Sequence, residues 1–135
     1  MYPPRIQTHN KVGLLYSDIL LDHFKNPRNV GELPPPAVTV EVSNPACGDI
    51  LRLSAQFTDG AVAGVKYKVR GCTASIAAGS ALTEWMMGKT AVQLADGRPA
   101  TIESAVGGLI PESQHAAVLC VDGVKALLRV IAVSS

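Results

Sequence analysis

Aromatic residues and net charge are both scarce in this chain. Only 4% of its 135 residues are aromatic, and the formal net charge is +1. Proteins that bind nucleic acid or anionic membranes usually carry an excess of Lys and Arg, and many single-strand binders add aromatic side chains on which bases stack. We therefore expect neither nucleic acid nor a membrane as a partner.

Long hydrophobic runs are absent, and cysteines are few. The chain has no run of about 18 apolar residues and no charged-then-apolar N-terminus, so we expect a cytoplasmic protein. Its three cysteines are Cys47, Cys72 and Cys120, and an odd number cannot pair completely within one chain. In a reducing compartment such cysteines are typically metal ligands, reactive thiols or core residues.

Hydrophobic residues, by contrast, are plentiful, at 47% of the sequence. This content is typical of a globular protein, and 135 residues are enough for one domain with its own core. Residues 1–13 contain two prolines and show no periodicity. We predict a flexible tail over residues 1–13 and a single domain over residues 14–135.

A hairpin is predicted between the first two cysteines. Residues 51–57 and 65–70 both alternate apolar and polar side chains, and Asp59-Gly60 between them is a strong turn signal. Cys47 lies twelve residues before Asp59, and Cys72 lies twelve residues after Gly60. Residues paired across an antiparallel ladder have Cα atoms roughly 4.5–5.5 Å apart. The hairpin would therefore bring both thiols to one end.

Several helices are predicted around this hairpin. Helical periodicity marks residues 16–24, with a cap near Ser17, a segment from Ser75 to Gly88, and a last helix over about residues 113–133. Residues 38–42 supply a further strand. The predicted fold class is α/β of the α+β kind, with a three-stranded antiparallel sheet packed against several helices. Cys72 would precede a helix N-terminus, whose partial positive charge attracts a thiolate.

The candidate site residues are Cys47, Asp49, Cys72, His115 and Cys120. Thiolate and imidazole select zinc or iron–sulfur clusters, and a carboxylate can complete either set. Each residue also has a plain structural role open to it: Asp49 as a turn residue, His115 as a surface residue at a helix start, and Cys120 as a core residue. The residues alone lead only to a Cys-rich metal or sulfur site.

Four ordered motifs resemble the iron–sulfur cluster assembly scaffolds of the NifU N-terminal/IscU-like family. They are the segments 16–31, 44–49 (NPACGD), 71–77 (GCTASIA) and 83–89 (TEWMMGK). This resemblance implies a non-enzymatic scaffold or carrier, with sulfurtransferase-like activity as a further option. It would accept sulfur from a cysteine desulfurase as a persulfide on its cysteines, and iron from an iron donor. The labile [2Fe–2S] cluster built from them would pass to apo-proteins, and Asp49 would keep that cluster labile.

The third cysteine departs from the family pattern. IscU-type members carry a cysteine directly after the histidine that begins the last helix, whereas here Ala116 follows His115 and the next cysteine is Cys120. Ala116 and Cys120 share a helix face about 6 Å apart. Either Cys120 supplies the missing ligand, which we expect, or the cluster uses Cys47, Cys72, His115 and Asp49, or stable assembly has been lost.

A second departure concerns partners and alternative functions. Residues 109–113 (LIPES) replace the motif that a dedicated Hsp70 chaperone recognises in IscU-type proteins, which argues against chaperone-driven release. One alternative is a zinc-dependent sulfur acceptor of the SufU type that activates a desulfurase; its zinc would be present in the isolated protein. Another is a structural zinc or interaction domain.

Overall fold

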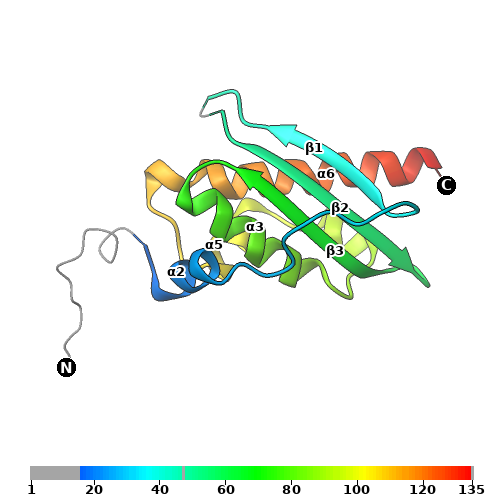
Figure 1. Cartoon of the computed structure of the whole chain (residues 1–135), viewed down its shortest axis with the longest axis horizontal. Coiled ribbons are helices and arrows are strands. Elements are labelled where there is room, and N and C mark those ends of the chain that lie inside the picture. The colour runs from blue at the N-terminus through cyan, green and yellow to red at the C-terminus, as the bar shows by residue number, and fades with distance from the viewer. Residues whose placement is uncertain (1–15, 47, 135) are drawn as a thin grey trace.

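The computed structural model describes residues 16–46 and 48–134, so the predicted tail over residues 1–13 lies outside the described residues. The elements follow one another as helix α2 (Asp18–Lys25), strands β1 (Val38–Ser43), β2 (Ile50–Thr58) and β3 (Ala61–Arg70), helices α3 (Thr73–Met86), α4 (Ala91–Ala95) and α5 (Pro99–Ala105), a short 3-10 helix η2 (Pro111–Ser113), and helix α6 (His115–Ser134). Figure 1 shows a sheet with α3 and α6 packed behind it. The predicted α+β class is confirmed.

The three strands form one antiparallel sheet in the order β1-β2-β3. The predicted turn joins β2 to β3, and both of its central residues have positive φ, 54° at Asp59 and 82° at Gly60. Such a turn matches the right-handed twist of the strands it connects. The pairing runs from Thr58↔Ala61 at the turn to Ile50↔Arg70 at the far end. The residues that flank the hairpin, including Asp49 and Cys72, therefore emerge together at that far end.

One face of the sheet is buried by α3 and α6. The core consists of inward-facing strand residues, such as Leu51, Leu53 and Tyr67, and apolar residues of the two helices. Gly79 of α3 lets the helix approach closely, because a Cβ there would lie 2.5 Å from the Tyr67 ring. None of the helices among the described residues has both the length and the hydrophobicity needed to cross a bilayer.

Helix α2 is fixed to α3 by a polar cluster. Ser17 caps α2 by accepting a hydrogen bond from the Leu20 N–H, as predicted. His23 is only 6% exposed, and its Nδ1 lies 2.7 Å from the Ser80 hydroxyl on α3. After α2 the chain runs across the outer face of the sheet toward β1 (Figure 1), where Glu32 forms an ion pair with Arg52. Among the described residues, no helix covers the rest of that outer face.

Candidate metal site

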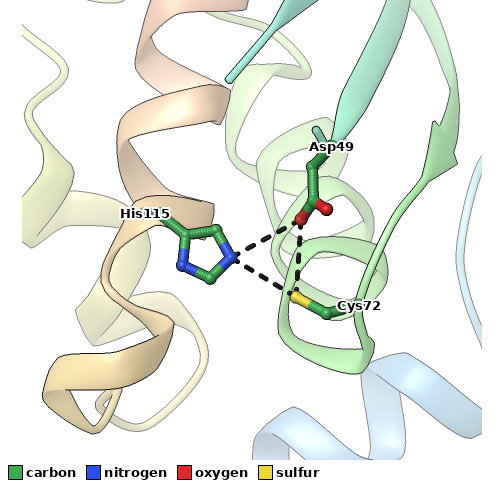
Figure 2. A group of neighbouring side chains, drawn as sticks. All are labelled: Asp49, Cys72 and His115. Carbon is green, nitrogen blue, oxygen red and sulfur yellow. Dashed lines mark hydrogen bonds and ion pairs between the residues drawn. The ribbon is translucent and has the colours of Figure 1, made fainter. Parts of the chain in front are cut away.

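Three side chains from three separate elements meet at the end of the hairpin. Asp49 immediately precedes β2, Cys72 precedes α3, and His115 is the first residue of α6. His115 Nε2 lies 3.5 Å from the Cys72 Sγ and 3.5 Å from the Asp49 Oδ2, and the Cys72 Sγ is 3.5 Å from the same Oδ2. Figure 2 shows the three side chains pointing toward one another. Their ligand atoms all lie within 4.8 Å of one another, so one metal ion can contact them all.

The local backbone explains why Asp49 and Cys72 meet. A tight loop precedes Asp49, whose carbonyl accepts a hydrogen bond from the Asn44 N–H, and Gly48 supplies a positive φ of 76°. On the other side of the hairpin, Gly71 leaves room for the carboxylate, since a Cβ at Gly71 would lie 2.6 Å from the Asp49 Cγ. The hairpin thus presses the carboxylate against the start of α3.

Asp49 is the buried member of the group, at 6% exposure. Its Oδ2 accepts a hydrogen bond of 2.5 Å from the Ser75 hydroxyl and one from the Cys72 thiol. Burial by itself would raise the pKa of Asp49, but the hydrogen bonds from Ser75 and Cys72 and the nearby His115 outweigh it, so the pKa lies below its usual value. The carboxylate is therefore ionised at neutral pH and available as a ligand.

The solvent exposure of the three side chains increases from Asp49 through His115 to Cys72. The side chain of His115 is 26% exposed, and Cys72 is exposed at the N-cap position of α3. The Cys72 sulfur makes no capping hydrogen bond to the helix backbone and instead contacts the side chains of Asp49, Ser75 and His115. The site is therefore open to solvent on the side of the Cys72 thiol, and the buried Asp49 carboxylate and the half-buried His115 imidazole lie behind it.

Of the predicted site residues, the structure brings together Asp49, Cys72 and His115. Cys120 is not part of this group: it is 1% exposed and belongs to the core between α6 and the sheet. Burial raises the pKa of its thiol to about 12. Ala116, the residue after His115, is fully buried on the same side of α6. Cys47 lies outside the described residues.

Ser75 was not among the predicted site residues. Its hydroxyl contacts both the carboxylate of Asp49 and the Cys72 sulfur, at 2.5 and 3.4 Å. A usable signal was present, because Ser75 lies three residues after Cys72 and a helix places such residues on one face. Hydrogen-bonding neighbours of this kind orient metal ligands.

The structure is a small α+β domain with an open group of one thiol, one carboxylate and one imidazole at the end of its sheet, and this is the ligand chemistry of a metal site. The family described as the NifU-like N terminal domain matches residues 15–131, and the chain belongs to that family. The iron-sulfur cluster assembly scaffold protein IscU of Azotobacter vinelandii is 38% identical, with 86% of this chain and 93% of that protein covered.

Other relatives agree with this assignment. The iron-sulfur cluster assembly scaffold protein IscU 1 of Archaeoglobus fulgidus is 34% identical over 82% of this chain and 72% of its own length. Among solved structures, the N-terminal part of a nitrogen-fixing NifU-like protein from Brucella abortus superposes with a TM-score of 0.58 at 22% identity, covering 85% of this chain and 81% of that chain. The last comparison supports the fold alone.

Proposed function

We propose that this protein is a scaffold on which a labile [2Fe–2S] cluster is assembled from sulfur and iron and then handed to apo-proteins. Family membership supports this role, since the similar proteins of A. vinelandii and A. fulgidus are named as iron–sulfur cluster assembly scaffolds. The observation that carries the proposal is the open group formed by Asp49, Cys72 and His115. Its partners would be a cysteine desulfurase, an iron donor and apo-acceptor proteins.

The residues of the group fit a cargo that must be both held and released. Cys72 offers a thiolate, the ligand type that iron–sulfur clusters require, and His115 offers an imidazole of the kind found in some two-iron clusters. Asp49 contributes an ionised carboxylate, which binds iron less strongly than a thiolate does. Because Cys72 is exposed, a cluster held there would be accessible to an acceptor protein. A mixed, open ligand set suits a donor better than a closed cage of four cysteines.

We propose Cys47 as the fourth ligand, from its place in the sequence opposite Cys72 on the predicted hairpin. Cys120 remains the alternative, and it would require α6 to move, because its sulfur lies in the core. Burial also keeps the Cys120 thiol protonated, whereas metal ligation requires a thiolate. The arrangement therefore favours Cys47, Cys72, Asp49 and His115 as the ligand set.

The test is anaerobic incubation of the full chain with ferrous iron, cysteine, a cysteine desulfurase and dithiothreitol, which reduces the persulfide sulfur to sulfide, followed by visible absorption and addition of an apo-ferredoxin. We expect a [2Fe–2S] spectrum that moves to the acceptor. Asp49→Ala should retain its cluster longer than the wild type does. A wild-type protein that forms no cluster, or one whose cluster never leaves, would contradict the proposal.

A second candidate function is a zinc-bound sulfur acceptor that activates a desulfurase. The observation that favours it is the ligand chemistry, since one thiolate, one imidazole and one carboxylate also form a good zinc site. Zinc that co-purifies, combined with stimulation of the desulfurase and no cluster formation, would select this function. Metal that cannot be removed without unfolding the protein would indicate a structural role instead.

A further inference from the structure

The outer face of β3 carries a row of three positive charges that leads to the site. Lys66, Lys68 and Arg70 are all exposed and alternate with inward-facing residues, so they share the face of the sheet that the helices leave open. Lys68 also lies directly opposite Arg52 on β2. Like charges paired across a ladder are destabilising, so this row costs folding stability.

The acidic groups on this face do not offset the row. Glu32 and Glu41 both form ion pairs with Arg52, each at 3.1 Å. Within the described parts of the chain, no carboxylate lies at ion-pair distance from Lys68 or Arg70. The two cations closest in sequence to Cys72 are therefore available to a partner.

Within the described residues, the edge of β3 is left uncovered at the same place. Tyr67 exchanges backbone hydrogen bonds with Asn29 and Gly31, which cover the edge there, and the chain then turns away across the sheet. Because backbone groups on a strand alternate in direction, those of Val69 point toward the same edge as those of Tyr67. In the described residues, no backbone hydrogen bond between elements reaches Val69.

A shallow apolar groove accompanies this free edge. It has a volume of about 150 Å³ and is lined by Pro27, Val30 and Ile76 together with the end of β3. Val30 is 52% exposed although it is a large apolar residue. Ile76 lies on α3, on the opposite side of β3 from the basic row. One edge thus has cations on one side and apolar side chains on the other.

We propose that this edge of β3 binds an extended segment of a partner protein in which acidic and apolar residues alternate. Such a segment would add to the sheet through the backbone of Val69, as edge-binding peptides do. Its side chains would point to the two faces in turn, with carboxylates against Lys68 and Arg70 and apolar groups against Ile76. Gly71 and Cys72 follow Arg70 directly, so the bound partner lies beside the metal site.

The same features favour protein over nucleic acid. A phosphate backbone carries an unbroken series of charges and needs many cations to bind tightly, whereas this row has three and lies next to Glu32 and Glu41. The inference goes beyond the proposed function and does not depend on it, since the edge, groove and charges are the same whichever metal the site holds.

The test is titration of the 15N-labelled full chain with an acetylated, amidated heptapeptide of alternating Glu and Val, followed by amide chemical shifts. We expect the largest shifts at Val69 and Ile76. The double variant K68E/R70E should weaken binding by about tenfold or more at low salt, because both cations become repulsive. K125E/R129E, which makes the same change in net charge on α6, should bind like the wild type.

Three further peptides and probes decide the mode of binding. A Lys–Val heptapeptide should not bind, and a Glu–Val peptide methylated at its backbone nitrogens should lose most of its affinity because it cannot pair with the edge. The proposal is overturned if the Glu–Val peptide does not bind at low salt, if K68E/R70E and K125E/R129E weaken binding equally, or if backbone methylation has no effect. Tighter binding of a short oligonucleotide than of the peptide would also overturn it.

Discussion

Cys72 and Cys120 carry the same thiol, but the fold places them in opposite surroundings. Cys72 stands exposed at the end of the sheet, in contact with Asp49 and His115, whereas Cys120 is 1% exposed among core residues of α6. The first contacts polar partners suited to holding a metal, and the second contacts apolar side chains. Residue type alone therefore does not define a ligand in this protein; the element that carries it and the face it presents do.

The largest expected difference between the two cysteines is in chemical reactivity. Under native conditions iodoacetamide should alkylate Cys72 readily, while Cys120 should react only through opening of the core. Because the unfolded population of a stable domain is at most about 10⁻³, Cys120 should react at least about a thousandfold more slowly. Peptide mass spectrometry measures both rates in one sample. Comparable rates would mean that α6 opens readily and that Cys120 can reach the site.

Two glycine substitutions separate the site from the core. Gly71→Ala places a Cβ 2.6 Å from the Asp49 Cγ and must displace the carboxylate. Because the Asp49 carboxylate would no longer be oriented toward the metal, the affinity of the protein for zinc or Co(II) should fall by about 10–100-fold. Gly79→Ala, in which the Cβ meets the Tyr67 ring at 2.5 Å, should instead cost about 1–3 kcal/mol of unfolding free energy.

Metal titration together with denaturant unfolding checks both glycine variants. The folded Gly79→Ala protein should keep the wild-type metal affinity, and Gly71→Ala should remain close to wild type in stability. If Gly71→Ala bound metal as tightly as the wild type, Asp49 would not be a ligand.

The same substitution should have different costs at the two cysteines. Cys120→Ser buries a hydroxyl among apolar neighbours and should lower the free energy of unfolding by about 1–3 kcal/mol. Cys72→Ser exchanges an exposed group and should change it by less than about 0.5 kcal/mol. Urea unfolding at neutral pH measures both values, with Cys120→Ala as a control that adds no polar group. Equal costs at both positions would contradict the buried placement of Cys120.

A smaller difference is expected in how the free energy of unfolding depends on alkaline pH. Burial raises the pKa of Cys120 to about 12 from 9.0, and burial together with the nearby Cys120 raises the pKa of Tyr67 to about 12 from 10.0. Both groups are thus more easily ionised in the unfolded chain. Their contribution to stability is complete below pH 9 and is lost as the pH rises toward 12.

Unfolding by urea between pH 8 and 11 checks this dependence. Cys120→Ala should lose stability less steeply than the wild type above pH 9, by at most about 1.4 kcal/mol per pH unit, the value for one proton. A wild-type curve that stays flat to pH 11 would show that neither group is buried as described.

Much of this fold follows from local signals in the sequence. The Asp59-Gly60 turn joins β2 to β3, and their pairing ends at Ile50↔Arg70. Asp49 lies one residue before that last pair and Cys72 lies two residues after it, so the pairing brings the two residues to the same end. The cap at Ser17 is also a local signal, and the structure confirms it. Short-range hydrogen bonding and strand alternation determine these features, so a single sequence reveals them.

The position of His115, the third residue of the site, depends on tertiary packing instead. His115 reaches Asp49 because α6 lies along the sheet with its first residue at the end of the hairpin, and no local pattern specifies that placement. The same packing decides the position of Cys120. Ala116 and Cys120 share a face of α6, as their spacing predicts, but that face is the one buried against the core. Cys120 as a metal ligand stays a prediction that the described structure does not favour.

The proposed ligand set is tested most directly by anaerobic cluster reconstitution on Cys72→Ser and Cys120→Ala side by side with the wild type. We expect Cys120→Ala to gain the same transferable [2Fe–2S] spectrum as the wild type and Cys72→Ser to gain none. Loss of the cluster in a folded Cys120→Ala protein, with the cluster retained in Cys72→Ser, would contradict the ligand set proposed from Asp49, Cys72 and His115.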